Sequence, residues 1–443
     1  MPRARDSVRT PPTTGRRSAP RRAATDATTQ GLEPPPALPR HAAAAVAAAS
    51  RQFPVLLLTG ARQVGKTTLL RALAAAGRRY VTLDDPLALR LAREDPALFL
   101  ETYAPSVLID EVQYAPQLLP HIKMAADARQ RAGHFWLTGS QPLHLMHGVS
   151  ESLAGRVAVL SLLGLSRREA LGLPRVGAFV PTPQHLRILQ RSATPAALHD
   201  LYGHIWRGSF PGLVARPGVS RDLFFGSYLQ TYLQRDVRDL AQVGDQTAFV
   251  RFIRATAART AQLLNMADLA RDADIAPNTA KSWLAVLEAS GIVSLLQPWH
   301  SNVSKRLVKT PKLHFLDTGL AAYLTQWNSP QTLEAGAMAG AFFESWVYGE
   351  ILRSHAHAGY AAPLYHYRDK DQREIDLLIE ADGLLHPVEC RKSAAPGRDA
   401  LAGIAALAHR GAALGPGAVV CMAPQVVPLQ AQPRVTAVPA WLL

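Results

Sequence analysis

The sequence predicts an α/β fold in which a parallel β-sheet is covered by helices. Five apolar runs with strand character alternate with segments of helical pattern, at residues 55–58, 80–83, 107–109, 135–137 and 157–162. This alternation is typical of a parallel sheet, because parallel strands need helical crossovers between them. The first run leads into a glycine-containing stretch, residues 60–70, which a helical pattern follows. Such sheets bind ligands beyond the carboxyl ends of their strands, so we expect the functional residues at that edge.

The stretch 60–70 carries a phosphate-loop pattern. Gly60 is followed after four residues by Gly65, Lys66 and Thr67, which matches G-x-x-x-x-G-K-[ST] between a strand and a helix. Glycines there let successive backbone N–H groups converge on phosphate oxygens at a helix N-terminus. Lys66 is predicted to reach the β and γ phosphates of ATP, and Thr67 to hold Mg²⁺ through its hydroxyl. The predicted nucleotide-binding residues are Gly60, Ala61, Arg62, Gln63, Val64, Gly65, Lys66, Thr67 and Thr68.

Later strands of the same sheet supply the other candidate catalytic residues. The apolar run 107–109 ends in Asp110, predicted to hold Mg²⁺, and Glu111, predicted to polarise the attacking water. Ser140 follows the next strand, where a polar side chain can sense the γ-phosphate. Arg156 lies just before the last strand, and its permanently charged guanidinium suits the charge on a transferring phosphoryl group, in its own subunit or a neighbour's. We therefore take Lys66, Glu111, Ser140 and Arg156 as the candidate catalytic set.

Length and charge bound the rest of the chain. Its 443 residues suggest about three domains. A formal net charge of +14 indicates an anionic partner, either nucleic acid such as double-stranded DNA or an anionic membrane surface, or simply a composition rich in Arg. Two cysteines argue against a disulfide scaffold and fit a reducing cytoplasm. No apolar stretch approaches the roughly 20 residues that span a bilayer, so we expect a cytoplasmic protein with no membrane partner. Residues 1–39 are predicted to be a disordered basic tail, either solvated or in contact with nucleic acid.

Residues 206–330 are predicted to form a helical, winged-helix-like region. Two helical patterns at 266–291 are separated by a short turn, and Pro277 opens the second. Strand-like pieces around Leu295 and Leu313 would add a wing to this helix-turn-helix pattern. The predicted buried stripe of the second helix is Ala280, Trp283, Leu284 and Leu287. Basic residues cluster near the wing, at Lys305, Arg306, Lys309 and Lys312. The region is either a DNA-binding module or one that packs against a partner.

The last segment brings together three carboxylates. Glu344 lies on a predicted helix, whereas Asp376 and Glu389 lie on two strands predicted at 373–380 and 384–391. A turn at residues 381–383 joins these strands as a hairpin. Three carboxylates converging at a sheet edge can bind Mg²⁺ for phosphodiester hydrolysis, which makes this set a candidate second metal site.

These motifs together, with "LDTGL" at 316–320, resemble the bacterial and archaeal AAA-type ATP-binding proteins that join a phosphate-loop ATPase domain to an uncharacterised C-terminal domain. The resemblance covers roughly residues 40 to 425. It implies a P-loop NTPase domain at 40–205 that hydrolyses ATP at Lys66, Thr67, Asp110 and Glu111, with Arg156 as arginine finger. It also implies a C-terminal α/β domain at 331–443 of the restriction-endonuclease-like PD-(D/E)xK kind. Homo-oligomers are common among such ATPases.

One departure from the nuclease pattern concerns the residue two positions after Glu389. The pattern has a lysine there on the same face of the strand, and this chain has Arg391, which cannot give up a proton and is not a neutral substitute. We therefore favour a terminal domain without nuclease activity. Three hypotheses remain open from the sequence. The first is an ATPase whose nucleotide state switches the orientation of the winged-helix and terminal domains on DNA. The second is an ATP-gated metal-dependent nuclease, and the third is a nucleotide-sensing scaffold that binds a protein partner.

Overall fold

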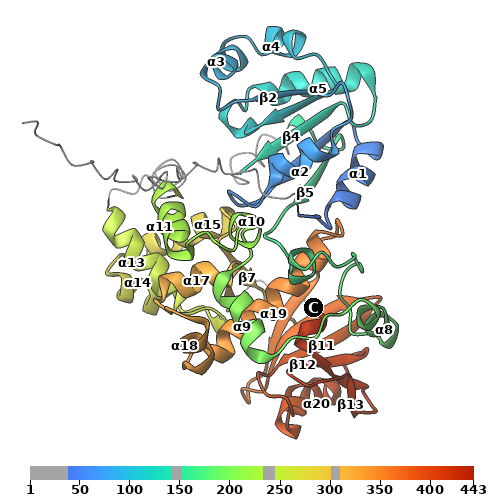
Figure 1. The fold of residues 1–443 in the computed structure, drawn as a ribbon, viewed down its shortest axis with the longest axis vertical. Coiled ribbons are helices and arrows are strands. Elements are labelled where there is room, and N and C mark those ends of the chain that lie inside the picture. Colours follow the sequence, from blue (N-terminus) through green and yellow to red (C-terminus); the bar gives the residue numbers. More distant parts are fainter. Residues whose placement is uncertain (1–37, 141–151, 233–244, 301–309) are drawn as a thin grey trace, which may run out of the picture. The chain divides into compact units, whose positions relative to one another are not determined.

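The computed structural model describes residues 38–140, 152–232, 245–300 and 310–443 (Figure 1). Nearly all of the predicted basic tail lies outside these residues, as do Lys305, Arg306 and Lys309 of the predicted wing. Within the described residues, no helix is both long enough and apolar enough to cross a membrane.

The N-terminal part of the described chain is built on a five-stranded sheet with the strand order β2-β3-β4-β1-β5. Every pairing in this sheet is parallel. Its strands are β1 (Val55–Thr59), β2 (Arg79–Thr82), β3 (Val107–Asp110), β4 (Phe135–Gly139) and β5 (Val157–Ser161). Each of the five predicted runs overlaps one strand, so the predicted parallel sheet is confirmed.

Helices cover both faces of this sheet, and the three central strands β1, β3 and β4 are buried along their whole length. They are α1 (Ala43–Gln52), α2 (Lys66–Leu73), α3 (Pro86–Glu94), α4 (Pro96–Thr102) and α5 (Leu118–Arg129), with a short 3₁₀ turn η1 (Val112–Tyr114). Alternate residues of β1 point to opposite faces. Leu57 packs in the core that includes α3, α4 and α5, whereas Leu56 packs with α1 and α2. Packing on both faces of the sheet thereby fixes the position of the C-terminal end of β1, where the glycine-containing loop begins.

The middle of the chain is mostly helical. Its helices are α7 (Arg167–Ala170), α8 (Pro183–Arg191), α9 (Leu198–Arg207), α10 (Pro211–Val214), α11 (Arg221–Tyr232), α13 (Gln246–Ala257), α14 (Met266–Ala273), α15 (Pro277–Ala289) and α17 (Thr318–Leu324). A three-stranded antiparallel sheet, β6-β8-β7, accompanies them, with β6 (Gln262–Leu263), β7 (Val293–Leu296) and β8 (Lys312–Phe315). Asp274, in the left-handed region at φ 56°, ends α14 and allows the turn into α15. The predicted stripe of α15 is buried.

The C-terminal part is a six-stranded mixed sheet with the order β13-β14-β12-β11-β10-β9, preceded by α18 (Pro330–Ala335) and the long helix α19 (Ala339–Ala356). Its strands are β9 (Leu364–Arg368), β10 (Glu374–Ala381), β11 (Leu384–Cys390), β12 (Gly417–Cys421), β13 (Val427–Gln430) and β14 (Val435–Pro439). The remaining elements are η3 (Arg398–Leu401), α20 (Ala402–His409) and η4 (Ala440–Leu442). β10 and β11 form an antiparallel hairpin, and Asp382 and Gly383 at its turn have φ of 51° and 74°. Two consecutive positive φ values suit an Asp-Gly turn.

Candidate nucleotide site

The glycine-containing loop lies between β1 and α2, as the phosphate-loop pattern requires. Gly60 has φ 142°, and a β-carbon on it would lie 2.1 Å from the carbonyl oxygen of Leu162, so no other residue fits there. Gly65, at φ 92°, is the N-cap of α2. The side chain of Lys66 is buried and its ammonium donates to the carbonyl oxygens of Gly60 (2.9 Å) and Ala61 (3.0 Å). The loop therefore has a tight backbone with its cation directed inside the curve, which fits an anionic phosphate.

The other residues predicted to bind nucleotide occupy the rest of this loop and the start of α2. Ala61 and Val64 are buried, and Val64 accepts a hydrogen bond from a guanidinium outside the loop. Gln63 has a positive φ of 62°. Arg62 lies within 3.4 Å of the Tyr114 hydroxyl, and Thr68 follows Thr67 in the first turn of α2.

Asp110 is placed beside Thr67 at the end of β3. The Thr67 hydroxyl donates to Asp110 Oδ1 at 2.8 Å, and the Thr138 hydroxyl also donates to that oxygen. The Tyr80 hydroxyl donates to Oδ2 at 3.1 Å. Burial, together with the neighbouring Asp110 carboxylate, raises the pKa of Tyr80, which therefore remains a hydrogen-bond donor. The hydroxyl of Thr67 and the carboxylate of Asp110 are hard oxygen donors at the loop, and this donor set fits Mg²⁺.

Glu111 stands next to Asp110 and is held by two side chains. Its backbone is in the left-handed region at φ 57°, and its N–H donates to Thr138 Oγ1 at 3.0 Å. Ser140 Oγ donates to Glu111 Oε2 at 3.0 Å, and Gln113 Nε2 donates to the same carboxylate oxygen. Gln113 also contacts Ser140 Oγ at 3.1 Å. The structure therefore brings Ser140 to Glu111. The sequence analysis missed Gln113, although it lies only two residues after Glu111, and it also missed Tyr80.

Arg156 lies at the other edge of the sheet. β5 pairs with β1 in parallel, with Val157 opposite Val55 and Ser161 opposite Thr59. Arg156 precedes β5, whereas the phosphate loop follows β1, so about five residues of strand, or roughly 16 Å, separate them. Its guanidinium pairs instead with the Asp127 carboxylate of α5. This geometry excludes a contact between Arg156 and the phosphate loop of the same chain.

A buried ion network lies behind the loop, and the sequence analysis did not identify it. Arg40 donates to the carbonyl oxygens of Val64 in the loop (2.6 Å) and Leu163 (2.7 Å), and its Nε lies 3.2 Å from Glu169 Oε1. The Nδ1 atom of His357, on the residue that caps α19, lies 3.3 Å from Glu169 Oε2. Burial alone would raise the pKa of Glu169, but His357 and Arg40 outweigh it and hold that pKa well below its ordinary value. The loop and α19 are thus joined through the side chains of Arg40, Glu169 and His357.

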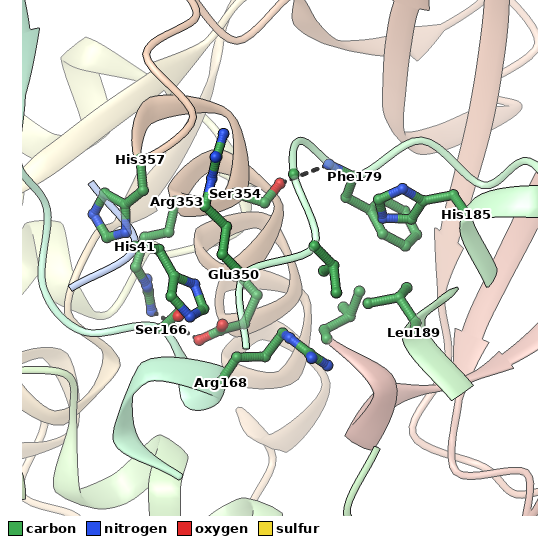
Figure 2. Close-up of a pocket in the computed structure, with 14 residues that line it drawn as sticks. His41, Ser166, Arg168, Phe179, His185, Leu189, Glu350, Arg353, Ser354 and His357 are labelled. Atoms are coloured by element: carbon green, nitrogen blue, oxygen red, sulfur yellow. Dashed lines mark hydrogen bonds and ion pairs between the residues drawn. The ribbon is translucent and has the colours of Figure 1, made fainter. Parts of the chain in front are cut away.

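A small cavity adjoins this network. Figure 2 shows His41, Ser166 and Arg168 beside residues of α19, with Phe179 and His185 to the right. Glu350 of α19 accepts a hydrogen bond from the backbone N–H of Arg167 at 3.0 Å. A second cavity, lined by Ala61 and Val64 of the loop, also includes Asp317 of the "LDTGL" segment. Asp317 caps α17 by accepting from Leu320 N at 2.7 Å.

The three carboxylates predicted as a second Mg²⁺ site are near one another, but protein cations lie among them. Lys312 Nζ contacts Glu344 and Asp376, and Arg391 contacts Asp376 and Glu389. In the described part of the chain, no group of three or more His, Cys, Asp or Glu side chains is arranged to hold a metal ion. The carboxylates of the predicted second Mg²⁺ site thus already have protein cations as partners.

Three family models match the chain. Residues 52–171 match an AAA domain, residues 198–331 a domain of unknown function (DUF8612), and residues 339–443 another domain of unknown function (DUF4143). The AAA match agrees with the phosphate loop and the parallel sheet described above.

Two curated proteins are similar over most of the chain. They are the uncharacterized protein Rv2008c of Mycobacterium tuberculosis and the uncharacterized protein Mb2031c of Mycobacterium bovis. Each is 32% identical over 367 residues, covering 81% of this chain and 74% of its own length. Among solved structures, the Walker-type ATPase paby2304 of Pyrococcus abyssi is 16% identical, with a TM-score of 0.41, over 64% of this chain and 94% of that one. The chain belongs to the same family as the two mycobacterial proteins, and it carries an AAA-type P-loop ATPase domain followed by two domains of unknown function.

Proposed function

We propose that this protein binds ATP with Mg²⁺ and hydrolyses it, and that its nucleotide state is coupled to the C-terminal part of the chain. The observation that carries the proposal is the convergence of Lys66, Thr67, Asp110, Glu111 and Ser140 at one edge of the parallel sheet, through the contacts Thr67–Asp110 and Ser140–Glu111. These residues lie on one helix, α2, and at the ends of two strands, β3 and β4. A nucleotide-sensing scaffold needs the first three, whereas a carboxylate such as Glu111 beside them favours hydrolysis.

Each residue has a distinct role in this proposal. The backbone N–H groups of 60–68 and the Lys66 ammonium bind the phosphates and stabilise the charge that develops on them. Thr67 and Asp110 hold Mg²⁺, which when bound neutralises phosphate charge. Glu111 accepts a hydrogen bond from the attacking water and polarises it. Ser140 and Gln113 orient the Glu111 carboxylate, because both donate to the same oxygen and leave the other one for water.

Arg156 fits this scheme only between subunits. It is about 36% exposed and points away from the loop of its own chain, so a finger role requires a homo-oligomer in which it reaches a neighbour's site. Mixing Arg156→Ala with Lys66→Ala protein is then expected to restore turnover above that of either variant alone, since mixed oligomers contain intact sites. Turnover of Arg156→Ala equal to that of the wild type would remove the residue from the mechanism.

The coupling part of the proposal rests on Arg40, Glu169 and His357. A phosphate that draws the loop backbone toward itself moves Val64, whose carbonyl oxygen accepts from Arg40. Arg40 and His357 share the two oxygens of Glu169, so this shift acts on α19. We further assign residues 40–205 to the ATPase domain, 206–330 to a winged-helix-like region and 331–443 to a nuclease-like fold without activity. The helix–turn–helix of α14 and α15 followed by β7 and β8 supports the second assignment.

The experiment that tests the proposal is steady-state ATP hydrolysis by the purified full-length protein with Mg²⁺, with and without double-stranded DNA, beside Lys66→Ala. We expect turnover in the wild type and a loss of at least a hundredfold in the variant. A rise in turnover with DNA, weakened steeply by salt, would assign the basic regions to DNA. ATP binding with no turnover in the wild type would overturn hydrolysis and favour the scaffold function with a protein partner.

A further inference from the structure

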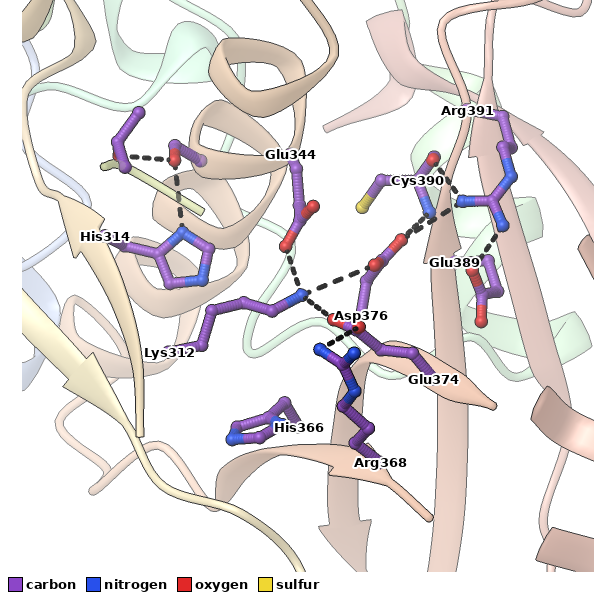
Figure 3. A network of polar contacts seen from close by, with 12 residues as sticks. Lys312, His314, Glu344, His366, Arg368, Glu374, Asp376, Glu389, Cys390 and Arg391 are labelled. Carbon is purple, nitrogen blue, oxygen red and sulfur yellow. Dashed lines mark hydrogen bonds and ion pairs between the residues drawn. The ribbon is translucent and has the colours of Figure 1, made fainter. Parts of the chain in front are cut away.

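The acidic cluster of the C-terminal sheet is organised around a lysine. Lys312 comes from β8 in the middle of the chain, and its side chain is only 3% exposed. Its Nζ lies 2.8 Å from Glu344 Oε1 and 3.5 Å from Asp376 Oδ1, and it also contacts Glu374 Oε1. Figure 3 shows this ammonium at the point where the three carboxylates, from α19 and β10, face one another. One protein cation therefore occupies the centre of the cluster.

Two further cations complete the network. Arg391 lies 3.4 Å from Asp376 Oδ2 and 3.0 Å from Glu389 Oε2, and Arg368 lies 3.6 Å from Glu374 Oε2. The backbone N–H of Cys390 donates to Asp376 Oδ2 at 2.9 Å. Four carboxylates thus face three cations, and every one of the four has a cation within contact distance.

The titration of these groups follows from their burial. Burial and the neighbouring Asp376 raise the pKa of Glu344 to about 8 and raise that of Glu389 well above its ordinary value. Four carboxylates exceed three cations by one negative charge, and a proton retained on Glu344 or Glu389 neutralises that charge. Burial would lower the pKa of Lys312, but Glu344, Asp376 and Glu374 outweigh it and raise that pKa, so the ammonium stays charged.

We propose that the acidic cluster binds the Lys312 ammonium and does not bind a divalent metal. The ammonium thereby connects β8 to α19 and to the C-terminal sheet. Mg²⁺ needs oxygen ligands at about 2.1 Å in octahedral geometry, and here the oxygens already contact an ammonium or a guanidinium. A metal could enter only by expelling Lys312, and the buried ammonium would then lose its partners. The cluster thus stabilises the packing of β8 against α19 and the C-terminal sheet through ion pairs. It is not the metal centre that a nuclease would need.

The proposal is tested first with Mn²⁺ on the full-length protein without nucleotide, by electron paramagnetic resonance of the free ion. The number of bound Mn²⁺ ions is expected to be the same in the wild type and in Asp376→Asn. Any Mn²⁺ that binds at the phosphate loop is common to both proteins and cancels. A Mn²⁺ ion bound by the wild type and lost in Asp376→Asn would overturn the proposal.

The second test is a double-mutant cycle of Lys312→Met and Glu374→Gln, read as the midpoint of urea unfolding. Lys312→Met keeps the aliphatic stem and removes the charge, and Glu374 is 30% exposed, so its amide variant is expected to fold. Glu374→Gln should lower the midpoint in the wild type and lower it less, or raise it, in Lys312→Met. Lys281→Met, at an exposed position of α15, is the control and should leave the midpoint unchanged. Additive shifts in the cycle would contradict a stabilising interaction between Lys312 and the acidic cluster. If Lys312→Met does not fold, the Mn²⁺ measurement decides.

Discussion

Glu111 depends on its neighbours for its orientation. Its backbone is left-handed at φ 57°, and Ser140, after β4, and Gln113, in η1, both donate to one oxygen of its carboxylate. Such a conformation is uncommon for a residue other than glycine and has an energetic cost that the surrounding contacts must offset. Here the hydrogen bond from Glu111 N to Thr138 Oγ1 supports the turn. The position of the candidate base is therefore set by three polar contacts, with Ser140, Gln113 and Thr138, and not by its own strand.

The first prediction at the residue scale concerns Gln113→Ala. We expect kcat for ATP hydrolysis to fall about tenfold with an unchanged Kd for ATP, because the Gln113 side chain donates to Glu111 and Ser140 and so positions the candidate base. Stopped-flow or steady-state turnover and equilibrium binding of an ATP analogue separate the two effects. Gln117→Ala, an exposed amide at the start of α5, is the matched control. An equal loss of ATP binding in Gln113→Ala would show that Gln113 acts on the loop as a whole.

The sequence could predict which residues form the phosphate loop. It could not predict which side chains from other parts of the chain contact the site. Gly60, Gly65, Lys66 and Thr67 form a contiguous pattern whose chemistry is local, and the structure has them in one loop and helix. Tyr80 reaches Asp110 from a neighbouring strand, a contact that depends on the strand order. Arg40 lies outside every motif, and its role follows from packing that residue spacing does not encode.

At the scale of elements, the position of Arg156 before its strand was enough to predict that it lies far from the phosphate loop of the same chain. It precedes its strand, whereas the phosphate loop follows one, and parallel strands keep all their N-terminal ends at the same edge. The parallel sheet was predictable because each strand is an apolar run between helical patterns. The contact of β8 with the C-terminal sheet through Lys312 was not, because Lys312 reads as one more basic residue of a predicted wing.

Glu169 provides a stability prediction at this scale. It is fully buried and accepts hydrogen bonds from the backbone N–H groups of His41 (2.7 Å) and Ser166 (2.8 Å), besides its contacts with Arg40 and His357. Glu169→Gln leaves Arg40 buried without its counter-charge, and we expect the free energy of unfolding to fall by about 3 kcal/mol in urea titrations. Glu94→Gln breaks an exposed pair with Arg90 and should change it by less than about 0.5 kcal/mol. Similar effects of the two changes would mean that the network contributes little.

The same network predicts how a nucleotide signal travels. In the wild type, binding of a non-hydrolysable ATP analogue is expected to change amide hydrogen exchange in the C-terminal half of α19. Arg40→Met should bind the analogue and lose that change, because the variant removes the hydrogen bonds to Val64 and to Glu169 together. Arg51→Met, an exposed arginine in the last turn of α1, serves as control. A response of α19 that persists in Arg40→Met would require another route between the loop and the helix.

Taken over the whole molecule, charge and burial of histidine set the response to acid. The chain carries a formal net charge of +14 with its 15 histidines neutral, so acidification adds positive charge to an already basic protein. Burial lowers the pKa of several of these histidines, and it lowers those of His185 and His366 to about 4. These histidines occur in several parts of the fold, from α8 to β9. Acidification is therefore expected to lower the stability of more than one part of the described chain.

The sign of the pH dependence follows from proton counting. Between pH 6.5 and about 4, an unfolded chain binds a proton at His185 and the native chain does not, so the free energy of unfolding falls as the pH falls through that window. His185→Gln should remove this contribution, which amounts to at most about 3 kcal/mol, and should flatten the profile relative to the wild type. Glu344, whose pKa is raised to about 8, acts in the opposite direction but is common to both proteins and cancels in their difference. Urea unfolding at pH 4.5 to 7.5 measures that difference, with His199→Gln, at a side chain 71% exposed, as the control. A difference between His185→Gln and the wild type that stays constant over this range would mean that the native protein takes up a proton at His185 as readily as the unfolded chain.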